Sequence, residues 1–144
     1  MNALQTELAC SITEAEEVVR QELAGVGFGV LTEIDVAAVL HEKLGVSRPA
    51  MKILGACNPQ LAHRALEVDQ SVGLLLPCNI VLEAAPGGTR VSAADPLDLM
   101  PGPALGQVAL DARGRLESVM AGIAAEIERR AASSEVQTGL TEQV

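Results

Sequence analysis

Lys52-Ile-Leu-Gly-Ala-Cys-Asn-Pro59 is the most informative stretch of the sequence, because it holds the end of one predicted strand and the start of one predicted helix. Its first part is an apolar run of strand length. Asn58 is a preferred N-cap residue and Pro59 is preferred at the first helical position, which predicts a helix over residues 59–68. Cys57 is therefore predicted at the mouth of that helix.

The chain before this stretch predicts two strands and two helices in alternation, over residues 4–10, 11–24, 28–36 and 37–44. Ser11 and Glu14 have the spacing of a capping box, which fixes the start of the first helix. The second strand alternates in polarity, which predicts Val30 and Ile34 on one face and the acidic residues on the other.

The chain after this stretch predicts a hairpin and a long helix. Pro86-Gly87-Gly88 separates two apolar runs, residues 79–84 and 89–93, as a hairpin turn does. Residues 107–132 carry apolar and small residues at steps of three and four, which predicts one amphipathic helix. Residues 133–144 are polar and predict a disordered tail.

This order of elements has too few βαβ crossovers for a doubly wound sheet and predicts a two-layer α+β fold. A chain of 144 residues with 49% hydrophobic residues is sufficient for one core, so residues 1–132 are expected to form a single domain.

The composition excludes several classes of partner. The formal net charge is −9, which repels phosphate backbones and anionic lipids, and one Phe without Trp or Tyr leaves little to stack on bases. We therefore expect no nucleic-acid partner and no membrane partner. The N-terminus does not resemble a signal peptide and no apolar run is long enough to span a bilayer, so we expect an acidic, soluble, cytoplasmic protein.

Five blocks of the sequence occur in a specific order: Phe28-Gly-Val-Leu-Thr-Glu-Ile-Asp-Val36, Lys43-Leu-Gly45, Lys52-Ile-Leu-Gly-Ala-Cys-Asn-Pro59, Gly73-Leu-Leu-Leu-Pro-Cys-Asn79 and Val91-Ser-Ala-Ala-Asp-Pro96. Together they resemble the family called domain of unknown function DUF302, over roughly residues 4–130. The resemblance implies a mainly antiparallel sheet with helices packed on one face. It also implies a homodimer, here through a sheet edge or the long helix, and it implies no assigned biochemical function.

Two Cys-Asn pairs mark the candidate site. Cys57-Asn58 and Cys78-Asn79 each lie at the edge of an apolar segment. Residues 41–64 also hold four of the ten cations and both histidines against one acidic residue. Our leading hypothesis is a small-ligand or anion site formed by the two pairs together with nearby basic residues, namely Lys52, His63 and Arg64.

Three alternatives remain open at this point. Cys57 as a nucleophile with Cys78 as resolving thiol would make a redox or sulfur-transfer protein, and this requires a thiol of lowered pKa. The same two cysteines are weak candidates for metal ligands, and no native metal is expected because each cysteine is isolated in the sequence. The third alternative is a purely structural interaction module. No GxGxxG or P-loop motif points to a nucleotide cofactor.

Overall fold

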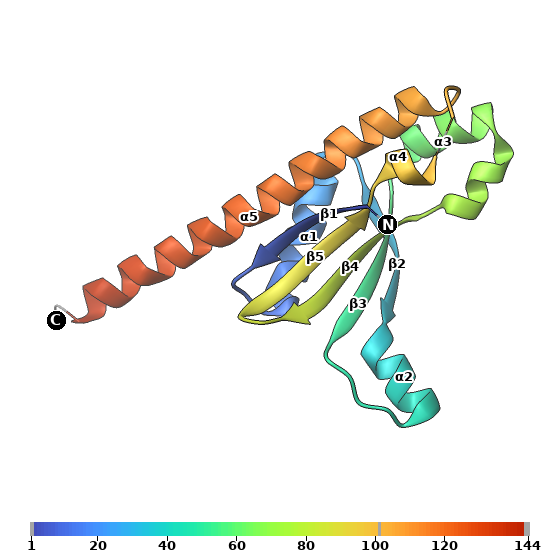
Figure 1. The fold of residues 1–144 in the computed structure, drawn as a ribbon. Helices are drawn as coiled ribbons and strands as arrows, with labels where there is room; N and C mark the ends of the chain where they lie inside the picture. Colours follow the sequence, from blue (N-terminus) through green and yellow to red (C-terminus); the bar gives the residue numbers. More distant parts are fainter. Residues whose placement is uncertain (1, 101, 143–144) are drawn as a thin grey trace.

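A computed structural model describes residues 2–100 and 102–142, with side chains up to residue 136. Its centre is a sheet of five strands in the order β1-β5-β4-β3-β2, in which all neighbouring strands are antiparallel (Figure 1). The strands are β1 (Ala3–Leu8), β2 (Gly29–Asp35), β3 (Met51–Cys57), β4 (Cys78–Ala85) and β5 (Gly88–Ala94). The predicted α+β class is confirmed.

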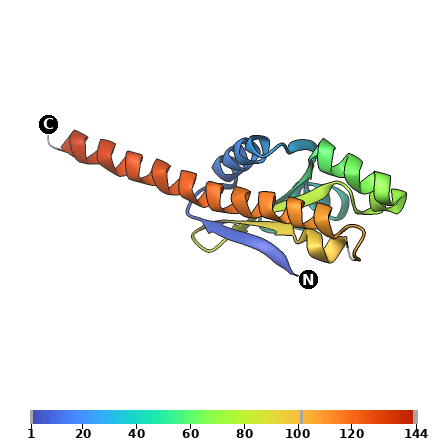
Figure 2. The ribbon, with the colours of Figure 1, turned by 90° about the horizontal axis from the view of Figure 1, so that it is seen from above.

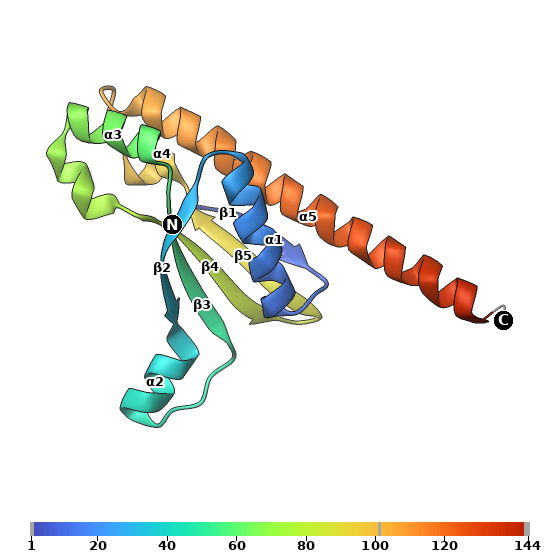
Figure 3. The same ribbon diagram turned by 180° about the vertical axis from the view of Figure 1, so that it is seen from behind.

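The helices are α1 (Ile12–Gly25), α2 (Val36–Leu44), α3 (Pro59–Val68), the 3-10 helix η1 (Gln70–Leu75), α4 (Pro96–Leu99) and α5 (Gly106–Glu142). Helices α1 and α5 lie over one face of the sheet (Figure 3). Helix α3, η1 and α4 gather at one end of the strands, and α2 projects beyond the opposite end. No described helix is long and apolar enough to cross a membrane.

Local chemistry explains the helix boundaries. The Ser11 hydroxyl accepts a hydrogen bond from the Glu14 N–H at 3.2 Å, and the Asn58 side chain accepts one from the Leu61 N–H at 3.1 Å. Both caps satisfy N–H groups that have no partner inside the helix. Helix α2 ends at Gly45, whose φ of 66° lies in the left-handed region that favours glycine.

The core lies between the sheet and the α1–α5 layer. Side chains from the sheet, such as Leu54, Ile80 and Leu82, are fully buried against it. The apolar stripe predicted on the long helix is buried throughout, at Leu105, Ala109, Ala112, Leu116, Val119, Ile123 and Ile127. Burial of this stripe supplies the tertiary support that a helix with internal glycines needs.

One sequence prediction about β2 is wrong. Val30 pairs with Ala56, whereas Ile34 pairs with Ile53, and a register shift lies between Val30 and Thr32. Directly paired residues share a face of the sheet, and Ile53 and Ala56 lie on opposite faces of β3. The bulge therefore turns Ile34 away from the face of Val30, and a period-two pattern cannot register the extra residue.

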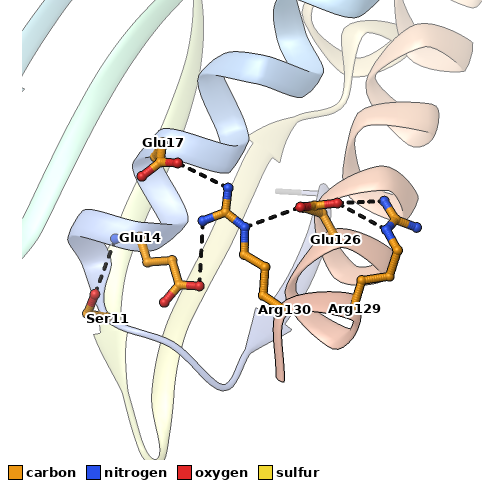
Figure 4. Close-up of polar contacts among 6 residues, drawn as sticks. All are labelled: Ser11, Glu14, Glu17, Glu126, Arg129 and Arg130. Atoms are coloured by element: carbon orange, nitrogen blue, oxygen red, sulfur yellow. Dashed lines mark hydrogen bonds and ion pairs between the residues drawn. The ribbon is translucent and has the colours of Figure 1, made fainter. Parts of the chain in front are cut away.

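Helix α5 continues past the predicted end at residue 132 to Glu142 and extends beyond the sheet (Figure 2). Arg130 ties α5 to the rest of the domain just before the exposed residues 131–136. Its guanidinium binds Glu17 of α1 at 3.0 Å and Glu126 of its own helix at 3.2 Å (Figure 4). The disordered tail expected over residues 133–144 remains a prediction, and residues 143 and 144 lie outside the described part.

Candidate functional site

The end of β3 and the start of β4 bring two thiols together. Ala56 pairs with Cys78 across the antiparallel ladder, and Cys57, the next residue on β3, is close enough to Cys78 to raise the pKa of that thiol. Helix α3 begins directly after Cys57, with Asn58 as its N-cap. Cys57, Asn58 and Cys78 consequently border the same cavity, which we call the thiol pocket.

The thiol pocket has a volume of about 20 Å³, which is enough for one water-sized group. Its walls come from β3, β4, α3 and the start of α5, and from the connections that precede β2, β4 and α5. They are apolar except for one side chain, and comprise Phe28, Ala56, Cys57, Asn58, Leu61, Ala62, Ala65, Leu76, Cys78, Met100, Val108 and Ala112.

Asn58 is the polar exception, and the oxygen and the nitrogen of its side chain each have a hydrogen-bond partner. It is 5% exposed, its oxygen accepts from the Leu61 N–H, and its amide donates to the Val26 carbonyl at 3.3 Å. Among the described residues, no buried side-chain nitrogen or oxygen lacks a hydrogen-bond partner. The pocket therefore offers sulfur and hydrocarbon to a ligand rather than a vacant hydrogen-bonding group.

Burial disfavours the thiolate form of both cysteines in the pocket. Burial raises the pKa of Cys57 above its ordinary value. Burial also raises the pKa of Cys78, and the neighbouring Cys57 raises it further. Removal from water disfavours the charged thiolate and therefore raises a thiol pKa. Cys57 thus lacks the lowered pKa that a neutral-pH nucleophile requires.

Lys52 lies at the other end of β3 and takes no part in the thiol pocket. Its ammonium binds Glu16 of α1 at 2.5 Å and also contacts Glu33 of β2, and Arg20 binds the same two carboxylates at 3.0 and 2.9 Å. The hydrogen bonds that Lys52 donates to Glu16 and Glu33 raise the pKa of its ammonium. This cluster, which we call the charged cluster, holds the edge of the sheet to α1.

The other basic candidates are engaged or remote. Arg64 binds Asp111 of α5 at 3.1 Å, and hydrogen bonds from Arg115 and Arg64 lower the pKa of that carboxyl. His63 is 75% exposed at its side chain and lies 3.9 Å from Glu67. Neither residue lines the thiol pocket.

Asn79 faces away from the thiol pocket. It is exposed and lines a groove on the uncovered face of the sheet together with Pro77, Val81 and Ser92. The structure therefore brings three of the seven candidate residues together and distributes the other four over separate surfaces.

Sequence reasoning missed Phe28 and Met100 as residues of the pocket. Met100 follows the short helix α4, and Phe28 lies in the connection before β2. Neither position belongs to a periodic pattern. For Phe28, a signal was its place at the start of the first family-like block, and for Met100 the sequence held none.

Two comparisons with known proteins, one of sequence and one of structure, identify the same family. The sequence model of the domain of unknown function DUF302 matches residues 4–123. The chain is also similar to the crystal structure of an uncharacterized conserved protein DUF302 from Bacillus stearothermophilus. That similarity has a TM-score of 0.79 and 32% identity, and covers 85% of this chain and 98% of the other. No curated protein matches the sequence significantly.

Proposed function

The chain belongs to the family of the domain of unknown function DUF302, which has no assigned activity, and we propose that it is a binding protein whose ligand site is the thiol pocket. The observation that supports the proposal is the convergence of Cys57 and Cys78 on one apolar cavity. A concave apolar site with a few polar or reactive groups is the usual form of a small-ligand site.

The geometry favours an uncharged or soft ligand over an anion. Arg64 and Arg115, the cations near the start of α3, are paired with Asp111. Lys52 is paired in the charged cluster. An anion would have to displace these carboxylates, whereas a ligand of one or a few atoms that prefers sulfur or hydrocarbon displaces nothing.

The geometry gives less support to a thiol enzyme. A catalytic cysteine at neutral pH needs a substantial thiolate fraction, and burial raises the pKa of Cys57 instead. We therefore propose binding rather than catalysis. The cytoplasmic location expected from the sequence remains a prediction.

Xenon tests the binding proposal, because this neutral atom enters dry apolar cavities of suitable size. We expect crystals under xenon pressure to show one xenon atom in the thiol pocket. Ala62→Leu, on the wall of the pocket, should abolish that peak, and Gln60→Leu, on the exposed side of the same helix, should leave it unchanged. A pocket without xenon in the unsubstituted protein would overturn the proposal.

We also propose a homodimer, through the edge of the sheet at β2. This strand has a free edge, and α2 after it has no buried residue. Large exposed apolar side chains gather on β2, on α2 and just after it, at Leu31, Ile34, Val39, Leu44 and Val46. Exposed apolar groups on an unpaired edge are typical of an interface. Two copies of one edge pair naturally about a two-fold axis, which makes a second copy the fitting partner.

Light scattering after size-exclusion chromatography tests the dimer. We expect a dimer for the unsubstituted protein and a monomer for Leu44→Glu. Leu74→Glu is the matched control, because Leu74 is 89% exposed and lines the groove on the uncovered face of the sheet that also contains Asn79. A monomeric unsubstituted protein, or equal effects of the two substitutions, would contradict this interface.

A further inference from the structure

We propose that the thiol pocket binds one soft monovalent metal ion, of the Cu(I) class, between the sulfur atoms of Cys57, Cys78 and Met100. The inference rests on the proposed function and names the class of ligand. The sequence offered Cys57 and Cys78 as weak candidates for metal ligands without a third ligand, and the inference follows from the fold, which places Met100 on the same cavity.

The concentration of sulfur is the first argument. The chain has three cysteines and four methionines, and three of these residues line the same cavity of about 20 Å³. They come from β3, β4 and the segment after α4, so tertiary structure alone assembles them. Thiolate and thioether sulfur are the ligands that Cu(I) prefers over the oxygen and nitrogen ligands of harder ions.

The character of the cavity is the second argument. Hard ions such as Mg²⁺ and Ca²⁺ need several oxygen ligands, and the side chain of Asn58 is occupied by its two hydrogen bonds. Structural zinc needs four ligands, and the described residues hold no cluster of three or more His, Cys, Asp or Glu suited to a metal. A water-sized, apolar, sulfur-lined space fits a bare soft ion.

The binding step balances without a change of oxidation state. Cu(I) forms bonds to the sulfur atoms of Cys57 and Cys78, each thiol loses its proton to solvent, and Met100 donates a lone pair. The two thiolates and one monovalent cation leave a net charge of −1. Helix α3 begins at Pro59, directly after Cys57, and its positive end stabilises that charge.

A Cu(I) titration of the full chain under anaerobic conditions, in competition with a chromophoric Cu(I) chelator, tests the inference. Because the chain has no Trp or Tyr, thiolate-to-copper charge-transfer bands in the near ultraviolet are directly visible. We expect one ion per chain. Cys57→Ser and Cys78→Ser should each weaken binding by more than about 100-fold, and Met100→Leu by about 10-fold, since even outer-shell changes cost 10- to 100-fold at metal sites.

Cys10→Ser is the matched control, because Cys10 is a third free, half-buried cysteine that does not line the pocket. It should leave the affinity unchanged. Weakening by Cys10→Ser equal to that by Cys57→Ser, or no weakening by Cys57→Ser, would overturn the inference.

Alkylation of the unsubstituted protein keeps the inference testable if a serine variant does not fold. One equivalent of Cu(I) should protect Cys57 and Cys78 from iodoacetamide and leave the reaction of Cys10 unchanged. Protection of Cys10 alone, or of no cysteine, would overturn it. Xenon in the pocket without Cu(I) binding would refute the metal and leave the binding site standing, whereas the absence of both would refute the proposed function as well.

Discussion

The two ends of strand β3 differ in whether their reactive side chains are paired with other residues or face a cavity. At one end, Lys52 is enclosed by Glu16 and Glu33, and Arg20 completes the charged cluster. At the other end, Cys57 and Cys78 border an apolar cavity. A shifted pKa alone would select both ends as candidate sites. The charged groups at one end are already paired with one another, whereas the thiols at the other end face a cavity, and it is this second arrangement that we propose as a ligand site.

Replacing Asn58 should cause the largest loss of stability, because this residue holds together the end of β3 where the thiols lie. Asn58→Ala removes the N-cap of α3 and leaves the Val26 carbonyl without this donor. We expect a loss of about 2 kcal/mol in the free energy of unfolding, measured by denaturant titration with circular dichroism. Asn79→Ala is the matched control on the exposed face and should change it by less than about 0.5 kcal/mol. Equal losses of stability in the two variants would show that Asn58 has no special role at the start of α3.

Removing Lys52 breaks the charged end. Lys52→Met leaves the carboxylates of Glu16 and Glu33 with Arg20 as their shared cation. The cluster is partly exposed, so we expect a loss of about 1 kcal/mol, between the values for surface and buried ion pairs. Adding Glu33→Gln to Lys52→Met should recover part of it. Additive losses in the double variant would show that the charges act independently.

Acid should weaken the charged end. Burial alone would raise the pKa of Glu16, but hydrogen bonds from Lys52 and Arg20 outweigh it and hold the pKa below its ordinary value. A carboxyl with a lowered folded-state pKa stabilises the protein above its unfolded pKa of about 4.3 and loses that contribution as the pH falls through the folded pKa.

Glu16→Gln should therefore make the fall in stability below about pH 4 shallower, as measured by denaturant titrations at several pH values. Glu67→Gln, on the exposed side of α3, is the control and should leave the slope unchanged. An unchanged slope in Glu16→Gln would show that the charged cluster does not contribute to acid stability.

His63 should have the smallest effect, because it belongs to neither end of β3. Its side chain is 75% exposed and lies outside the thiol pocket. His63→Gln should change stability by less than about 0.5 kcal/mol and leave Cu(I) affinity unaltered. A clear loss of Cu(I) affinity would show that His63 belongs to the ligand site, as the sequence predicted.

Local chemistry explains what the sequence predicted well. Asn58 and Pro59 define the start of α3 through a cap and a fixed φ, both of which act within a few residues. The apolar stripe on α5 likewise depends on spacing along one helix. These features need no knowledge of the rest of the chain.

Tertiary structure decides what the sequence could not. Lys52 and Arg64 stand among uncompensated cations in the sequence, yet their partners Glu16 and Asp111 come from distant helices. The same holds for the pocket: the two Cys-Asn breaks were visible, but the place of Met100 depends on an irregular connection.

A crystal of the unsubstituted protein soaked with Ag(I) shows whether the thiol pocket binds a soft metal ion, because silver is a soft monovalent ion with a strong anomalous signal. We expect one silver ion in the thiol pocket, bonded to the sulfur atoms of Cys57 and Cys78 and next to that of Met100. Silver bound at Cys10 or on the surface, with the thiol pocket empty, would contradict it.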